Sequence, residues 1–264
     1  MSGEDSQLSA GQRREALKEV YAQAQACERC AELAATRKTV VFGAGNADAD
    51  LMFVGEAPGA SEDEQGLPFV GAAGKLLEKL LGEIGLMRAD VFIANTLKCR
   101  PPGNRDPQPI EIENCREYLY RQVELIQPRV ICTLGNFATK LLRDDPTGIT
   151  RLHGQPEVRE VGRRAVRLYP IFHPAAALYT PRMLQTLRED FQRLPELLAL
   201  PAPEQSQSLE IPEFDEEPSQ SAGASAAGNA SVDGAAASTG ASRTSAGGEA
   251  AADAAAEADQ LGLF

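Results

Sequence analysis

The sequence predicts an α/β protein, a three-layer α/β/α sandwich around a central four-stranded, mainly parallel sheet, followed by a disordered C-terminal tail. Short apolar runs of strand length alternate with longer segments of helical periodicity. Each run is followed by residues typical of loops and sites rather than of hairpin turns. Strands separated by helices of this length connect in parallel, with helices on both faces of the sheet.

Four apolar runs supply the expected strands, at residues 51–54, 91–95, 130–134 and 166–172. The expected helices cover residues 11–26, 72–86, 109–127, 136–143 and 181–199. Residues 38–49 contain several turn-forming residues and predict an irregular approach to the first strand. In a parallel sheet the carboxyl ends of the strands meet at one edge, which should gather Glu56, Asn95, Gly135 and His173.

Charge and composition divide the chain near Pro201. The formal net charge is −12, and residues 201–264 carry −10 of it. Residues 201–258 are acidic and rich in Ala, Ser and Gly, which predicts a disordered linker. We expect a flexible N-terminus over residues 1–10, one folded domain over residues 11–200 and a separate peptide at residues 259–264. The acidity belongs to the tail and does not exclude a nucleic-acid partner for the domain.

The sequence predicts a cytoplasmic protein without a membrane segment, and we expect a monomer. It has no apolar run of about 20 residues and no signal-peptide pattern at its polar start. Five cysteines in a reducing compartment favour metal binding or buried thiols over disulfides.

Four of the cysteines form a candidate metal site. Cys27 and Cys30 have the spacing that lets two thiolates share one centre, Cys99 follows the second expected strand, and Cys115 lies within a helix. Cys132 lies within an apolar strand and is expected in the core. The spacing fits zinc or an iron–sulfur cluster and does not choose between them. The alternative is a set of unrelated free cysteines.

The stretch from residue 55 to residue 71, GEAPGASEDEQGLPFVG, is the strongest candidate for an active-site loop. It joins an expected strand to an expected helix, a geometry that presents backbone donors and side chains to a ligand. It holds one aromatic residue, Phe69, and four carboxylates: Glu56, Glu62, Asp63 and Glu64.

This stretch, together with ANTLKCRPP, the helical cysteine and FHPAAAL, resembles the family 4 uracil-DNA glycosylases over residues 15–198. The resemblance implies a base excision repair enzyme that flips uracil out of single- or double-stranded DNA. It would hydrolyse the N-glycosidic bond and leave an abasic site. The resemblance also implies a 4Fe-4S cluster, held by Cys27, Cys30, Cys99 and Cys115.

The resemblance assigns roles to the site residues. Phe69 would stack on uracil, Asn95 would read its N3–H and O4, and His173 would donate a hydrogen bond to O2 as charge develops there. Glu56 matches an acid beside base and sugar, and Glu62 matches the acid that positions or activates water. The uracil-binding set also includes Ala57. Stronger members of the superfamily carry Asp at that position, so the water-activating residue stays open between the two glutamates.

DNA contacts are expected from the loops around the site. Pro58 and Gly59 resemble elements that pinch the DNA backbone, and Leu178 resembles a wedge that fills the space left by the flipped base. Three cations are candidate phosphate contacts or ordinary surface charges: Lys98, Arg100 and Arg105. The loop lacks the basic, histidine-bearing insert that traps DNA covalently in another branch of the superfamily, so we expect turnover.

The last five residues, QLGLF, resemble the peptide by which bacterial DNA-metabolism proteins dock on the sliding clamp. The anchors would be Gln260, Leu261, Leu263 and Phe264, with the apolar side chains filling a hydrophobic pocket. The alternative is a hydrophobic terminus that arose by chance.

Other readings compete with uracil excision. One is a glycosylase of broader deaminated-base scope, and another is a nonenzymatic metal-bearing DNA-binding module with the same fold. For single residues, Asn95 could cap a strand end and His173 could be a loop residue before proline. His153 matches no motif and is expected at the surface or behind the site.

Overall fold

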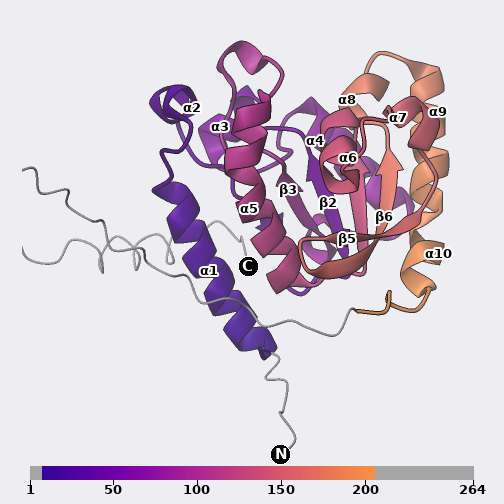
Figure 1. The fold of residues 1–264 in the computed structure, drawn as a ribbon. Coiled ribbons are helices and arrows are strands. Elements are labelled where there is room, and N and C mark those ends of the chain that lie inside the picture. The colour runs from indigo at the N-terminus through magenta and orange to yellow at the C-terminus, as the bar shows by residue number, and fades with distance from the viewer. Residues whose placement is uncertain (1–7, 206–264) are drawn as a thin grey trace, which may run out of the picture.

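The computed structural model describes residues 8–205, which form a six-stranded sheet between two layers of helices (Figure 1). The strand order is β1-β3-β2-β4-β6-β5. The four central strands are parallel: β3 (Phe92–Asn95), β2 (Leu51–Gly55), β4 (Val130–Leu134) and β6 (Arg164–Ile171). These are the four strands that the sequence predicts, so the α/β fold is confirmed.

The sheet has six strands rather than the four expected, because an antiparallel strand closes each edge. β1 (Ala44–Gly45) pairs with β3, and β5 (Glu157–Val161) pairs with β6. β1 is only two residues long, too short for a periodic signal. β5 has three charged and two apolar side chains in no regular alternation, and only Val161 is buried, as is common in a strand at the edge of a sheet. It turns into β6 through Gly162, which has a φ of +61°.

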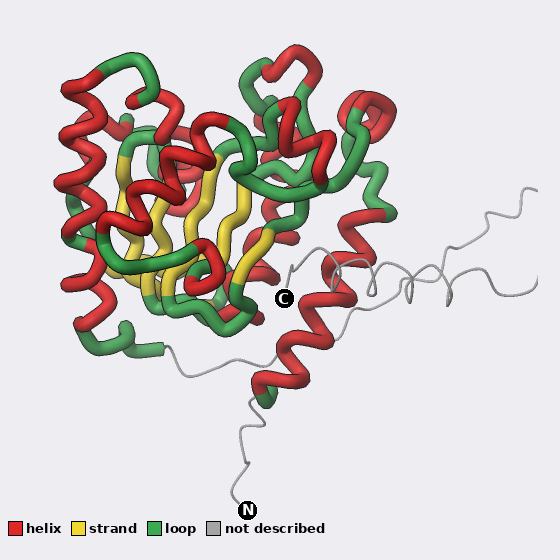
Figure 2. Tube along the Cα trace, turned by 180° about the vertical axis from the view of Figure 1, so that it is seen from behind, coloured by secondary structure: helices red, strands yellow, loops and turns green. Residues whose placement is uncertain are grey.

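Helices cover both faces of the sheet (Figure 2). One layer contains α1 (Ala10–Gln25), α5 (Pro109–Ile126) and α6 (Asn136–Arg143). The other contains α4 (Ala72–Glu83), α9 (Pro181–Gln192) and α10 (Leu194–Ala199). Alternate side chains of one strand enter the two cores: Met52 and Val54 pack on the first layer, and Leu51 and Phe53 on the second. Burial on both faces explains the continuous apolar runs.

One expected helix is divided. Residues 181–199 form α9 and α10, with a break at Arg193, where the sequence pattern predicts a single helix. Pro195 lies in the first turn of α10. A proline has no N–H for the hydrogen bond of a continuous helix, and it is tolerated in a first turn, where that donor has no intrahelical partner.

Short helical turns occupy several of the loops between the longer elements. α3 (Ala60–Gln65) follows β2, η1 (Arg88–Asp90) precedes β3, and η2 (Pro102–Asn104) follows it. α2 (Ala31–Thr36) follows the first cysteine pair, α7 (Ile149–Leu152) follows α6, and α8 (Pro174–Ala177) follows β6. Because β2, β3 and β6 are parallel, α3, η2 and α8 lie at the same edge of the sheet.

None of the helices within residues 8–205 combines the length and the apolar character needed to cross a bilayer. The proposed clamp peptide at residues 259–264, residues 1–7 of the expected flexible N-terminus, and the linker beyond residue 205 lie outside the described residues.

Candidate active site

A cleft of about 460 Å³ opens at the carboxyl edge of the parallel strands. This volume is within the usual range for small-molecule sites. Its walls come from the loops after β2, β3 and β6, and its lining residues are Glu56, Ala57, Pro58, Gly59, Glu62, Phe69, Ala73, Asn95, Pro101, Asn104, Arg105, His173 and Ala175. The structure thus brings together all of the expected catalytic and uracil-binding residues. Gly135 supports His173 from behind, since a Cβ at this glycine would lie 3.1 Å from the histidine Cβ.

Asn95 ends β3 at the bottom of the cleft, and its side chain carries an unused acceptor. The residue is 1% exposed, and its Oδ1 is a buried atom with no hydrogen-bond partner among the described residues. A Cβ at Gly55 would lie 2.4 Å from this oxygen and 2.8 Å from the Phe69 ring, so only glycine leaves room for both side chains. A buried acceptor without a donor costs about 1–3 kcal/mol, which a ligand that supplies a donor would recover.

Phe69 forms an aromatic wall of the cleft and has an unusual backbone. Its ring lies 5.5 Å from the His173 ring, centroid to centroid, with 29° between the planes. Its φ is +53°, a left-handed conformation that costs a bulky residue about 1–3 kcal/mol. Such a conformation persists only where the surroundings hold it, and it sets the direction in which the ring faces the cleft.

His173 is fixed as a neutral hydrogen-bond donor. It caps α8, and its Nδ1 accepts the backbone N–H of Ala175 at 3.1 Å. Burial lowers the pKa of His173 to about 4, although the nearby Glu62 opposes this shift. The ring is therefore neutral at pH 7, and because Nδ1 is the acceptor, the proton is on Nε2.

Glu56 follows β2 and carries a carboxyl group with a raised pKa. Burial, reinforced by the charge of Asp106, raises the pKa of Glu56 to about 6. The main chain at Glu56 is bound to the segment directly after β3. The Glu56 carbonyl accepts the Leu97 N–H at 3.0 Å and the Thr96 hydroxyl. The backbone at Glu56 is thus held in place, and its carboxyl group is largely ionised at neutral pH, as a general base must be.

Both carboxylate oxygens of Glu62 accept backbone hydrogen bonds. Oε2 accepts the N–H of Gly59 at 3.1 Å, and Oε1 accepts those of Val70 at 3.0 Å and Gly71 at 2.9 Å. These charge-assisted bonds tie the start of α3 to the segment after Phe69. Glu62 lines the cleft, but its oxygens are engaged in holding the loop.

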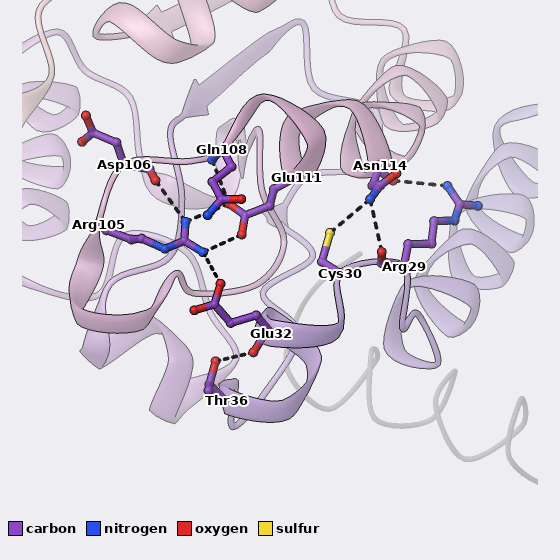
Figure 3. Close-up of polar contacts among 9 residues, drawn as sticks. All are labelled: Arg29, Cys30, Glu32, Thr36, Arg105, Asp106, Gln108, Glu111 and Asn114. Carbon is purple, nitrogen blue, oxygen red and sulfur yellow. Dashed lines mark hydrogen bonds and ion pairs between the residues drawn. The ribbon is translucent and has the colours of Figure 1, made fainter.

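The structure adds Asn104 and Arg105, both on the η2 loop, to the cleft. Arg105 pairs with Glu111 at 2.7 Å and with Glu32 at 2.8 Å, which fastens this wall to α5 and α2 (Figure 3). The Arg100 Nε donates to the Asn104 Oδ1 at 2.7 Å. The signal that could have placed both residues in the cleft is the turn sequence PPGNR, residues 101–105, shortly after Cys99.

Two of the expected DNA contacts are placed differently. Lys98 is 1% exposed, so it cannot reach a phosphate and that interpretation is wrong. Leu178 is half-buried and outside the cleft lining, whereas its neighbour Tyr179 is 90% exposed. Pro58 and Gly59 do line the cleft.

The four expected metal ligands surround a second, smaller cavity. Cys27, Cys30, Cys99 and Cys115 all line it. Donors point at three of the sulfur atoms: the Arg37 guanidinium at Cys99 (3.3 Å), the Lys98 N–H at Cys115 (3.3 Å) and the Asn114 amide at Cys30 (3.6 Å, Figure 3). Within residues 8–205, no three His, Cys, Asp or Glu side chains stand close enough to hold a single metal ion.

The donor set nevertheless suits an anionic sulfur centre. All four side chains are free thiols, and they enclose a space instead of converging on one point. N–H donors and cations directed at sulfur are what a cluster with thiolate ligands requires from its surroundings. The fifth cysteine, Cys132, is fully buried in β4, which confirms its expected place in the core.

Lys98 lies between the two cavities. Its Nζ donates to the Asn95 carbonyl at 2.9 Å and to the Gln122 Oε1 at 2.6 Å, and the Gln122 amide donates to the Phe42 carbonyl. Its backbone N–H donates to Cys115. A single buried residue therefore contacts both the strand end that carries Asn95 and the cysteine cavity.

The chain matches known proteins over its folded part. Residues 42–196 match the family model of the uracil DNA glycosylase superfamily. The type-4 uracil-DNA glycosylase of Archaeoglobus fulgidus is 46% identical over 188 residues, which are 69% of this chain and 94% of that protein. The type-4 enzyme of Sulfurisphaera tokodaii is 43% identical over 71% of this chain and 87% of its own length, and that of Saccharolobus solfataricus 46% over 66% and 82%.

The family-model match covers all six strands, the loops that line the cleft, and Cys99 and Cys115 of the cysteine cavity. The chain is a member of the uracil-DNA glycosylase superfamily and, within it, of the type-4 uracil-DNA glycosylases.

Proposed function

We propose that this protein excises uracil from DNA by hydrolysing the N-glycosidic bond, the first step of base excision repair. The observation that carries the proposal is the buried Asn95 Oδ1, an acceptor without a donor beside an aromatic wall. Uracil presents N3–H at the edge where cytosine presents an acceptor. The cleft would therefore accept uracil and reject cytosine, which would leave two acceptors facing each other in a dry pocket.

The base must leave the helix to reach this pocket, because the cleft has no room for a duplex around Asn95. Stacking on Phe69 would offset part of the cost of unstacking from its neighbours. Asn95 would accept N3–H through Oδ1 and donate to O4 through its amide nitrogen. Pro58 and Gly59, which line the cleft, and the exposed loop after α8 would meet the DNA backbone.

Bond cleavage leaves negative charge on uracil O2 and oxocarbenium character on the sugar. The Nε2–H of His173 would donate to O2 and stabilise this charge without transferring its proton. A neutral donor suits the task, since the pKa of His173 is far below neutral pH. Loss of one donor of this kind costs about 10²–10³-fold in rate in other enzymes.

A water molecule must then attack the sugar. We assign its activation to Glu56, whose raised pKa of about 6 keeps the carboxylate ionised but basic at neutral pH. We assign Glu62 to the loop, because both of its oxygens accept backbone N–H groups. Glu56→Gln should lower kcat, and Glu62→Gln should disturb loop geometry. Equal kcat values for both variants and the unmodified chain would refute both assignments.

We further propose that Cys27, Cys30, Cys99 and Cys115 hold a 4Fe-4S cluster. Bound there, the cluster would link the end of α1, the loop after β3 and the middle of α5 through iron–thiolate bonds. The support is the shared cavity, the N–H donors and cations directed at the sulfurs, and the family of the chain. Iron analysis and the visible spectrum of the purified protein test this directly.

The C-terminal peptide is proposed to bind the sliding clamp, which would place the enzyme on DNA in the cytoplasm. The support is the sequence alone: Gln260, Leu261, Leu263 and Phe264 follow an acidic linker. The test compares clamp binding of the full chain with that of a chain lacking residues 260–264. Equal binding would rule the interaction out.

A uracil-release assay tests the main proposal. Oligonucleotides carrying one uracil, one hypoxanthine or no modified base, single- and double-stranded, are incubated with the full chain. Released base and abasic sites are then measured. Uracil release alone supports the proposal, and release of hypoxanthine as well would show a broader glycosylase. No release from any substrate would leave a nonenzymatic DNA-binding role.

A further inference from the structure

Arg88 reaches from η1 to the backbone of the cleft loop. Its Nη1 donates to the Phe69 carbonyl at 3.0 Å, and its Nη2 donates to the Pro68 carbonyl. The Nη1 also lies 3.3 Å from the Glu78 carboxylate on α4, which orients the guanidinium. The arginine is half-buried, with 26% of its side chain exposed, and it does not line the cleft. The two guanidinium nitrogens therefore donate to two neighbouring backbone carbonyls, and the arginine side chain occupies no space in the cleft.

The other side of the same segment is held by Glu62. Its Oε1 accepts the N–H groups of Val70 and Gly71, the two residues after Phe69. Four successive residues, 68 to 71, thus have two carbonyls bound by a cation and two N–H groups bound by an anion. Charge-assisted bonds of this kind are stronger than neutral ones, and together they fix the peptide planes on both sides of Phe69.

Gly74 completes the arrangement. A Cβ at this position would lie 1.7 Å from the Phe69 carbonyl oxygen, so the first turn of α4 approaches the loop as closely as only glycine permits. The Phe69 backbone is left-handed, with a φ of +53°, and would relax if its surroundings released it. Relaxation would rotate the ring out of the cleft wall.

We propose that Arg88 is a positioning residue for base recognition: by holding the Pro68 and Phe69 carbonyls, it keeps the Phe69 ring in the plane on which the flipped base stacks. This inference rests on the proposed uracil excision. Arg88 makes no contact with the base or the reacting atoms, and it acts through Phe69 alone. Its removal should therefore impair the stacking of the base more than it impairs the fold.

The test compares Arg88→Ala with a matched control, Arg129→Ala. Arg129 also donates to two backbone carbonyls, those of Leu198 at 2.9 Å and Leu200 at 2.6 Å, and 31% of its side chain is exposed. It does not line the cleft. We expect single-turnover uracil release by Arg88→Ala to fall about 10–100-fold, the loss typical of a misplaced binding group. Arg129→Ala should stay within about twofold of the unmodified chain.

A second measurement separates positioning from a general loss of stability. DNA carrying a non-cleavable uracil nucleotide and DNA carrying an abasic-site analogue are compared for binding. Arg88→Ala should bind the first about tenfold more weakly and the second unchanged, because the abasic analogue has no base to stack. Loss of both affinities together, or neither, would overturn the proposal.

A double-mutant cycle with Phe69→Ala tests whether Arg88 acts through the Phe69 ring. If Arg88 acts through the ring, Arg88→Ala should lower uracil release by less than about twofold once the ring is gone. Full additivity of the two losses would contradict the proposal. The unmodified chain separates the two hypotheses. If it releases no uracil, the proposed function is refuted. If it releases uracil and Arg88→Ala releases it at the same rate, only the positioning role of Arg88 is refuted.

Discussion

The two cavities of this protein are built from neighbouring segments but in opposite ways. The cleft at the strand ends contains a buried polar atom, the Asn95 Oδ1, that has no hydrogen-bond partner among the described residues. In the cysteine cavity, three of the four sulfurs already receive an N–H donor or a cation. The cleft is about 460 Å³ and open, whereas the cysteine cavity is small and mostly enclosed.

This difference is the one we expect between a site for a transient ligand and the proposed site of a permanently bound cluster. A pocket that must bind, react and release cannot satisfy all of its own polar groups, so it carries a cost in the empty state. A permanently bound group is not released, so the polar groups around it can all form hydrogen bonds in the finished protein. The cleft should therefore respond to substitutions in rate and selectivity, and the cysteine cavity in stability and metal content.

The largest expected effect is at His173. His173→Ala removes the Nε2–H donor to the developing charge on O2 and should lower kcat by about 10²–10³-fold. His153→Ala is the matched control, since His153 pairs with Asp190 and does not line the cleft. Single-turnover kinetics on uracil-containing DNA measure both. Similar losses in the two variants would contradict the assigned role of His173.

The next effect concerns the unused acceptor. Asn95→Ala should reduce kcat/KM for uracil about 5–150-fold, which corresponds to about 1–3 kcal/mol for the lost hydrogen bonds. Asn46→Ala is the control at the opposite end of β3, where the Asn46 N–H donates to the Val91 carbonyl and its Oδ1 caps a turn. If Asn95→Ala keeps full kcat/KM, the acceptor has no part in recognition.

The cysteine cavity should show the opposite pattern. Cys115→Ser should abolish iron binding and visible absorbance and lower the Tm by about 4–8 °C, for a loss of about 2 kcal/mol. Cys132→Ala also alters a buried thiol but should retain all of the iron. Iron analysis and thermal unfolding are the measurements. Full iron content in Cys115→Ser would remove this residue from the ligand set.

The smallest effect is on pH dependence. Because the pKa of Glu56 is raised to about 6, its carboxylate form dominates at pH 7 and is lost as the pH falls through 6. We expect kcat to be about half of its maximum at pH 6 and about one tenth of its maximum at pH 5. Titration of His173, with a pKa of about 4, adds to the loss only at still lower pH. In Glu56→Gln, a lower rate without the pH 6 limb is expected, and persistence of that limb would point to another base.

The sequence predicts the centre of the fold better than its edges. The parallel strands are visible because burial on both faces makes them continuous apolar runs. The edge strand β5 escapes prediction because three of its five side chains are charged, so it forms no continuous apolar run. The break between α9 and α10 was likewise missed, because the helical periodicity continues across Pro195.

Some residues of the site can likewise be predicted from the sequence, and others depend on contacts between distant segments. The convergence of Glu56, Asn95 and His173 follows from parallel strand ends meeting at one edge, so order along the chain is enough to predict it. The contribution of Asn104 and Arg105 depends on the path of the η2 loop, which is set by distant carboxylates on α2 and α5. The left-handed Phe69 could not be predicted, since an aromatic residue disfavours that conformation by itself.

The hydrogen bond from the Ala175 N–H to the His173 Nδ1 has a consequence for how this site tolerates change. The proton on Nε2 is directed by a main-chain atom two residues away, so the tautomer of His173 depends on the backbone at position 175 and not on its side chain. A proline there would remove the only group in this turn that determines the tautomer. A larger side chain at position 175 would take up space in the cleft, but the imidazole would still keep its proton on Nε2.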